Sequence, residues 1–174
     1  MPLIGHNKVY IRSLNSEDRQ FFCKTPSCCD TSQVNDHEAD YMVLNCMDFR
    51  LRDNLTCQLN NKGMKNNYDE FILAGASLGY NGITGYTWDT VFEDHINLAH
   101  TLHGVSTIML IDHMNCGAYK YQYPSITLGS TEERDLHLSN LHAAKLKLQA
   151  KYGEQYSIET YLLSIDGCTL ERIE

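Results

Sequence analysis

Four short apolar segments along the chain have the pattern of buried strands. Each is a run of apolar residues that ends in polar or turn-forming residues. They cover residues 41–46, 70–74, 106–111 and 157–163. The strands are separated by longer stretches with a different periodicity, which predicts that strands and helices alternate along the chain.

Two of the intervening stretches have the pattern of helices. In residues 88–103, apolar side chains recur every three or four positions, which places them on one helical face. They are Trp88, Val91, Phe92, Ile96, Ala99 and Leu102, with Gly104 as a stop signal. Residues 131–152 are rich in good helix formers and are followed by Gly153, which predicts a second helix.

Strands that alternate with helices predict a parallel sheet covered on both faces. We therefore expect an α/β fold with a mostly parallel central β-sheet flanked by helices. The length of 174 residues and the hydrophobic content of 43% favour one substantial core. The segment before residue 41 has a weaker pattern, from which we predict only a short helix near residues 16–22.

Charge and hydropathy exclude two classes of partner. The net charge is −8 without a cluster of Lys and Arg, whereas nucleic-acid binding relies on cationic contacts. No segment approaches the ~20 apolar residues that cross a bilayer, and the N-terminus lacks the apolar run of a secretory signal. We expect a soluble cytoplasmic protein, in which the seven cysteines are free thiols available to a metal.

Metal-binding residue types follow two of the predicted strands. Cys46 ends the first strand, and His113 and Cys116 follow the third. Parallel α/β sheets place their working residues beyond the carboxyl ends of strands. Each residue alone is more often structural, because a Cys at a strand end is usually a small buried hydrophobe. Together they predict a zinc site with three protein ligands and an open fourth position, flanked by Asp48 and Arg50.

Other signals favour plainer interpretations. Adjacent cysteines rarely bind one ion together, so Cys23, Cys28 and Cys29 do not predict a second site. The histidines at 95, 100 and 103 do not share one chelating face and are expected in solvent or at an interface. The glycine-rich residues 74–87 lack a phosphate-binding motif, and either approach the metal loop or form a surface turn. The tyrosines at 119, 121 and 123 fit either a pocket or a dimer seam.

The order of three motifs resembles the signature of the beta-class carbonic anhydrases. The motifs are Cys46-x-Asp48-x-Arg50, Ala74-Gly75 and His113-x-x-Cys116-Gly117. The resemblance runs from residue 41 to the C-terminus and implies a beta-carbonic anhydrase-like fold with a zinc-binding α/β domain at 41–174. Residues 1–40 then correspond to an N-terminal arm, partly helical, that packs on a partner subunit.

This resemblance implies a zinc enzyme that reversibly hydrates carbon dioxide to bicarbonate. Zinc is held by Cys46, His113 and Cys116, with water in the fourth position, or Asp48 in a closed state. Zinc-bound hydroxide attacks the carbon. Asp48 orients the hydroxide, and Arg50 pairs with Asp48 and draws it off the metal. The resemblance also implies a homodimer or tetramer.

Several positions depart from the family's pattern. Ile72 and Leu73 stand where Arg-Asn is usual, Asn115 replaces an Asp, and Phe49 replaces a small residue. These changes bear on the substrate pocket, which we expect to be narrower or more apolar. Two alternatives stay open: hydrolysis of carbonyl sulfide or carbon disulfide at the same site, and a non-catalytic zinc-binding protein of this fold.

Overall fold

The computed structural model of the protein describes residues 37–83 and 85–173. The predicted N-terminal arm lies outside the described residues except for residues 37–40. The short helix predicted near 16–22, with Cys23, Cys28 and Cys29, also lies outside them. The arm and its contact with a partner subunit therefore stay predictions.

A five-stranded sheet in the order β2-β1-β3-β4-β5 lies at the centre of the described part. The strands are β1 (Tyr41–Cys46), β2 (Tyr68–Leu73), β3 (Thr107–His113), β4 (Ser157–Leu163) and β5 (Leu170–Ile173). The first four are parallel, and β5 runs antiparallel to β4. The predicted mostly parallel sheet is confirmed. The short strand β5 was not predicted, because four residues with two charged side chains give no clear strand pattern.

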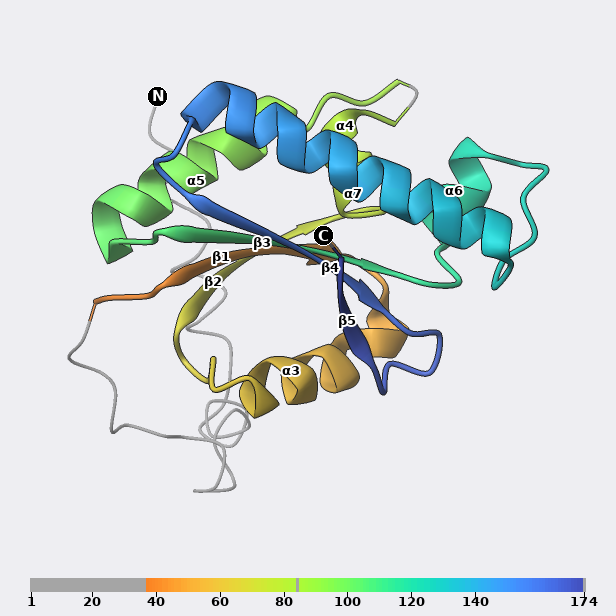
Figure 1. The fold of residues 1–174 in the computed structure, drawn as a ribbon, viewed down its shortest axis with the longest axis horizontal. Coiled ribbons are helices and arrows are strands. Elements are labelled where there is room, and N and C mark those ends of the chain that lie inside the picture. Colours follow the sequence, from red (N-terminus) through yellow and green to blue (C-terminus); the bar gives the residue numbers. More distant parts are fainter. Residues whose placement is uncertain (1–36, 84, 174) are drawn as a thin grey trace, which may run out of the picture. The chain divides into compact units, whose positions relative to one another are not determined.

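Helices cover both faces of this sheet, as the alternating pattern predicts. They are η2 (Phe49–Leu51), α3 (Arg52–Asn61), α4 (Ser77–Asn81), α5 (Asp89–His103), α6 (Gly117–Gln122) and α7 (Thr131–Tyr152). Figure 1 shows α5 and α7 on one face and α3 on the other. The two predicted helices match α5 and α7, whereas α3, α4 and α6 were not predicted.

Alternate residues of the central strand β1 pack into two separate cores. Met42 and Leu44 join the cluster beneath α5 and α7, together with Phe92. Val43, which lies between them in the sequence, packs with Leu59 of α3 on the other face. This alternation follows from the two-residue period of a strand. It explains why β1 reads as a continuous apolar run, since both of its faces are buried.

The apolar face predicted for α5 is only partly buried. Phe92 and Ile96 are fully buried and pack on the sheet, but Val91 is 49% and Leu102 is 61% exposed. Val91 and Leu102, with the exposed Leu98 between them, follow a second helical row. The single apolar face predicted for this helix therefore corresponds to two rows, of which one packs on the sheet.

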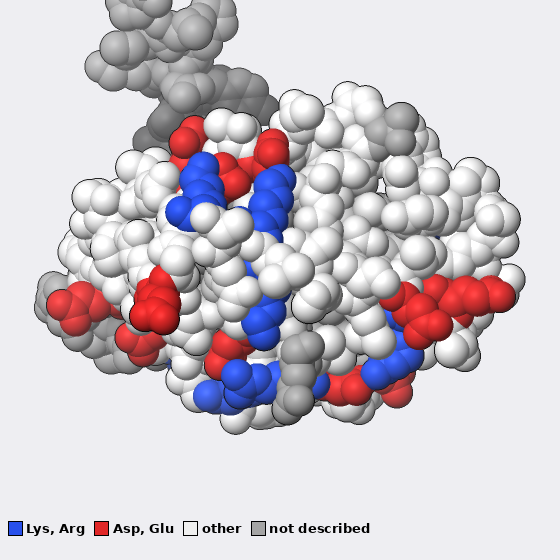
Figure 2. Space-filling view, turned by 45° about the horizontal axis from the view of Figure 1, so that its top comes forward, with Lys and Arg blue, Asp and Glu red and all other residues white. Residues whose placement is uncertain are grey.

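Charged residues on the face that carries α5 and α7 form mixed pairs. Lys147 of α7 lies 2.9 Å from Asp89 of α5, and Lys151 of α7 pairs with Glu93 of α5. Figure 2 shows basic side chains lying among acidic ones on this face. These pairs join the two helices that cover the larger core. None of the helices in the described part is long and apolar enough to cross a membrane.

Candidate metal centre

Three metal-binding side chains converge at the carboxyl ends of β1 and β3. Cys46 ends β1, His113 ends β3, and Cys116 follows in the next loop; β1 and β3 are parallel neighbours in the sheet. One ligand atom from each residue lies within 4.8 Å of the others. The predicted metal-ligand residues are therefore brought together in a group that could hold a metal ion.

The spacing of the two sulfurs fits a single tetrahedral ion. Cys46 Sγ and Cys116 Sγ are 3.8 Å apart. Two thiolates bound to one tetrahedral zinc at about 2.3 Å each would be roughly 3.8 Å apart. The donor set of two sulfurs and one imidazole is also one that zinc prefers.

The third donor, His113, is oriented by its own backbone neighbour. Its Nδ1 lies 2.9 Å from the carbonyl oxygen of Met114. A proton on Nδ1 donates to that carbonyl, and Nε2 then carries a free lone pair. Nε2 is buried and has no hydrogen-bond partner among the described residues. A buried nitrogen without a partner is uncommon, and a metal ligand is one explanation for it.

The loop between His113 and Cys116 turns sharply through Asn115. This residue has φ of 62°, a left-handed conformation that Asn tolerates better than most residues. The turn brings Cys116 back beside His113 and starts α6 at Gly117. Asn115, noted above as a departure from the family's pattern, is therefore compatible with the local backbone.

Hydrogen bonds to Cys46 favour its thiolate form. The Cys116 thiol donates to Cys46 and lowers the pKa of Cys46, with further lowering by His113 and by the N–H of Gly75. Gly75 N is 3.3 Å from Cys46 Sγ. In this pair Cys116 retains the proton, so the pKa of Cys116 is raised. The bond from Gly75 supports the interpretation that the glycine-rich segment approaches the metal loop.

Asp48 and Arg50 form a bidentate ion pair beside the three donors. Arg50 Nε and Nη2 donate to the two carboxylate oxygens at 2.9 and 2.6 Å. These bonds lower the pKa of Asp48 to about 2, so the carboxylate is ionised at neutral pH. Arg50 Nη2 also donates to the carbonyl of Asn115 at 2.9 Å. Asp48 Oδ2 lies 3.9 Å from His113 Nε2, which places the carboxylate at the edge of the centre.

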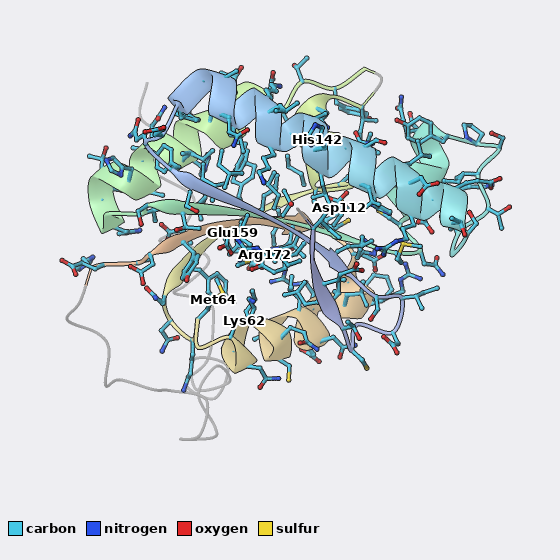
Figure 3. All side chains as sticks on the ribbon, viewed as in Figure 1. Lys62, Met64, Asp112, His142, Glu159 and Arg172 are labelled. Carbon is cyan, nitrogen blue, oxygen red and sulfur yellow. The ribbon has the colours of Figure 1, made fainter. Side chains whose placement is uncertain are left out.

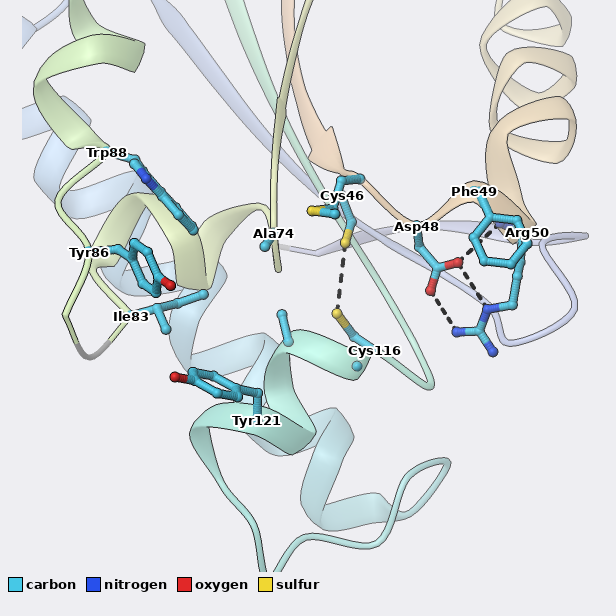
Figure 4. Close-up of a pocket in the computed structure, with 13 residues that line it drawn as sticks. Cys46, Asp48, Phe49, Arg50, Ala74, Ile83, Tyr86, Trp88, Cys116 and Tyr121 are labelled. Carbon is cyan, nitrogen blue, oxygen red and sulfur yellow. Dashed lines mark hydrogen bonds and ion pairs between the residues drawn. The ribbon is translucent and has the colours of Figure 1, made fainter.

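A cavity of about 550 Å³ opens beside the two sulfurs. Figure 4 shows Cys46 and Cys116 between an aromatic wall and the Asp48–Arg50 pair. The wall includes Ile83, Tyr86, Trp88 and Tyr121. Most of the remaining lining is apolar. Phe49 lines the rim and is 84% exposed.

Two other departures act outside this cavity. Leu73 is buried in the core beneath α5 and α7, and Ile72 is partly exposed on the edge strand β2. Neither is among the described residues that line the cavity. Of the three tyrosines in α6 and just after it, Tyr121 lines the cavity, whereas Tyr119 is buried and Tyr123 is half-buried.

A buried polar network that was not predicted from the sequence lies next to the donors. Its centre is Asp112, which is fully buried below α7 (Figure 3). Ser77 donates to Asp112 through its N–H at 2.9 Å and its hydroxyl at 2.6 Å. The hydroxyl of Tyr119 donates at 2.6 Å, and His137 Nδ1 lies 2.9 Å away. An acidic residue at the end of an apolar strand was the available signal.

Comparison with known proteins places the chain in a class. No protein-family model matches it. Its fold resembles the beta-carbonic anhydrase CcaA (TM-score 0.57, 13% identity, 98% of this chain and 96% of that chain) and a carbonic anhydrase of Streptococcus mutans (0.55, 14%, 99% and 100%). A tetrameric beta-carbonic anhydrase of Sordaria macrospora is also similar (0.54, 14%, 95% and 92%). The chain therefore has the α/β beta-carbonic anhydrase fold.

Two relatives are similar in sequence as well. An uncharacterised protein of Rickettsia bellii is 31% identical over 132 residues, which cover 75% of this chain and 80% of that protein. An uncharacterised protein of Rickettsia conorii is 32% identical over 132 residues, covering 75% and 70%. The chain belongs to the same family as these two rickettsial proteins.

Proposed function

We propose that this protein is a zinc enzyme that reversibly hydrates carbon dioxide to bicarbonate. The observation that carries the proposal is the group formed by Cys46, His113 and Cys116, with its sulfur spacing of 3.8 Å and its unpartnered imidazole nitrogen. Zinc bound there would supply Lewis-acid activation of water near neutral pH. The fold shared with beta-carbonic anhydrases supports the choice of reaction.

The Asp48–Arg50 pair is proposed to orient the attacking water. An ionised Asp48 accepts a hydrogen bond from water at the centre, and its two bonds from Arg50 fix the direction of that acceptor. The short distance from Asp48 to the imidazole also permits a closed state, in which the carboxylate takes the fourth ligand position. Arg50 opposes that state, because the carboxylate would give up charge-assisted hydrogen bonds to reach it.

The apolar cavity supports a small, weakly polar substrate. Carbon dioxide has no net charge or dipole and gains little from polar groups in its ground state. The wall that includes Trp88 and Tyr121 can hold such a molecule against the centre while limiting access of bulk water. The same apolar lining favours carbonyl sulfide or carbon disulfide as a second candidate substrate.

Metal analysis and two assays on one preparation test these proposals. We expect about one zinc per chain and measurable carbon dioxide hydration by stopped flow. Sulfide release from carbonyl sulfide and carbon disulfide tests the second candidate. Zinc without turnover of any of the three substrates would leave a non-catalytic zinc protein, and a chain that binds no zinc would refute the proposed centre.

We also propose that the protein assembles as a homodimer or tetramer. The edge strand β2 carries the exposed Ile72, and α5, which contacts β2, exposes Leu98 and Leu102. These apolar side chains fit a surface covered by a second copy of the chain. The tetrameric fungal carbonic anhydrase with this fold supports the same proposal. Light scattering at micromolar concentration tests it, and a monomer would contradict it.

A further inference from the structure

A chain of buried polar side chains connects helix α7 to the loop that carries Cys116. Glu133 is fully buried and accepts the N–H of Cys116 at 2.8 Å and the N–H of Gly129 at 2.5 Å. His137, one turn further along α7, is also fully buried. Its Nε2 lies 3.5 Å from Glu133 Oε1, a charge contact without hydrogen-bond geometry, and its Nδ1 lies 2.9 Å from Asp112 Oδ2. The connection therefore runs from Asp112, the residue before His113, through His137 and Glu133 to the backbone of Cys116.

Glu133 departs from the usual role of a glutamate at its position. Ser130 caps α7 by accepting the N–H of Glu133 at 3.2 Å, and Ser-x-x-Glu is the pattern of a capping box. In that motif the glutamate normally reaches back to the N–H of the capping residue. Here the N–H of Ser130 donates to the carbonyl of Thr127 instead. Both carboxylate oxygens of Glu133 are thereby available to Gly129 and Cys116.

The cost of this burial indicates a role beyond holding α7 on the sheet. Buried carboxylates are unfavourable unless each is paired and hydrogen-bonded. An apolar pair of similar volume would attach α7 to the sheet without that cost. It would not, however, accept the N–H of Cys116. That bond and the bond from Arg50 to the carbonyl of Asn115 hold the left-handed turn from two sides.

We propose that Glu133, supported by His137 and Asp112, is a positioning residue for the metal centre. It fixes the Cys116 peptide so that the thiolate meets Cys46 and His113 at a distance suited to one ion. The inference rests on the proposed zinc centre. Groups that orient metal ligands typically change metal affinity by about 10–100-fold when they are altered.

Glu133→Gln in the full chain tests the proposal with little change in size. The amide offers one acceptor oxygen, and its NH₂ faces one of the two backbone donors. Glu132→Gln, at the exposed preceding position of α7, is the matched control. Zinc affinity is measured by competition with a chromophoric chelator, and the cobalt-substituted protein reports the thiolate-to-metal absorption band. Thermal unfolding of both metal-free variants measures any purely structural effect.

We expect Glu133→Gln to bind zinc about 10–100-fold more weakly and to alter the cobalt band, while Glu132→Gln matches the parent. Parent-like zinc affinity and an unchanged cobalt band in Glu133→Gln would overturn the inference, whatever the melting temperature. The proposed function fails separately: a parent chain that binds no zinc would refute the centre itself.

Two substitutions of His137 keep the question open if Glu133→Gln does not fold. Gln places a donor near the position of Nε2 and retains the link to Glu133, whereas Asn places one near Nδ1 and retains only the link to Asp112. We expect His137→Asn to bind zinc at least about tenfold more weakly than His137→Gln. Equal zinc affinity in these two variants would overturn the role assigned to Glu133.

Discussion

Two carboxylates flank the proposed metal centre, and the protein holds them in opposite environments. Asp48 lies at the rim of the cavity, where its own side chain is 13% exposed, and is bound by Arg50, whose side chain is 48% exposed. Asp112 lies on the inner side, where Tyr119 and His137 bind it and all three side chains are buried. The same chemical group is therefore held by one exposed partner at the rim and by several buried partners inside.

Because of this difference, the Asp48 carboxylate can move, whereas the Asp112 carboxylate cannot. An exposed ion pair exchanges its partner for water at little cost. A buried carboxylate that loses a partner is left unpaired where water cannot replace it. The Asp48–Arg50 pair is therefore suited to act on whatever enters the cavity. The network around Asp112 is suited to hold the metal-binding loop still.

Removal of the Cys116 thiol should have the largest effect on zinc binding. Cys116 lies between the Asp48–Arg50 pair and the network around Asp112. In Cys116→Ser, we expect zinc to fall from about one per chain to near zero and activity to be lost with it, because one of three protein ligands is gone. Cys57→Ser, which changes an exposed thiol of α3, is the control and should keep its zinc. Metal analysis after gel filtration measures both variants, and full occupancy in Cys116→Ser would refute its assignment.

The two carboxylates themselves should differ in their effect on stability. Asp112→Ala leaves Ser77, Tyr119 and His137 without their shared acceptor, and we expect it to lower the free energy of unfolding by about 3–5 kcal/mol. Asp48→Ala removes a pair whose arginine is solvent-exposed, and it should cost only about 1 kcal/mol. Urea unfolding of the metal-free variants provides the comparison. Similar losses in the two variants would contradict the distinction.

The framework and the grouping of the three proposed ligand residues could be predicted from the sequence, because each rests on a local pattern. The strand Tyr41–Cys46 is buried on both faces and reads as an apolar run, and α7 ends at a glycine. Cys46 and His113 stand at strand ends and Cys116 follows in the next loop, and parallel neighbouring strands bring such ends together. The bounds of β1, β4 and α7 are as predicted.

The buried network around Asp112 could not be predicted from the sequence, because only tertiary contacts bring its residues together. In the sequence, Asp112 is only the polar end of a predicted strand, and His137 is one of many polar residues on a long predicted helix. Glu133 matches a capping box, whereas the structure directs its carboxylate to the loop of Cys116. The two apolar rows of α5 were merged for a similar reason, since periodicity does not show which row meets the sheet.

Loss of Arg50 should affect rate more than structure. In Arg50→Ala, Asp48 loses the partner that fixes its direction and opposes its movement onto the metal. We expect zinc to stay bound and the rate of hydration to fall roughly 100-fold, an effect typical of a misplaced catalytic group. Arg134→Ala is the matched control, because Arg134 forms a similar bidentate pair with Glu171 away from the cavity. Parent-like activity in Arg50→Ala would show that the pair does not act on the reaction.

The smallest expected effect is on the stability of the protein at acid pH, where the Asp48–Arg50 pair and the buried Glu133 should respond differently. Bonds from Arg50 lower the pKa of Asp48 from 3.8 to about 2. Burial alone would raise the pKa of Glu133, but the adjacent His137 imidazole and hydrogen bonds from backbone N–H groups outweigh it and lower this pKa from 4.5 to about 2. A carboxylate whose pKa is lowered by folding stabilises the protein above its unfolded pKa, and this contribution is lost as the pH falls toward the folded value.

The stability of the metal-free parent should therefore approach that of Glu133→Gln as the pH drops from 5 toward 2. The corresponding gap for Asp48→Asn should be smaller and should shrink in 1 M salt (Debye length about 3 Å), because salt screens a pair with an exposed partner more than a fully buried one. Urea midpoints at pH 5, 4 and 3, with and without salt, measure both gaps, and a gap for Glu133→Gln that widens in acid would contradict this account.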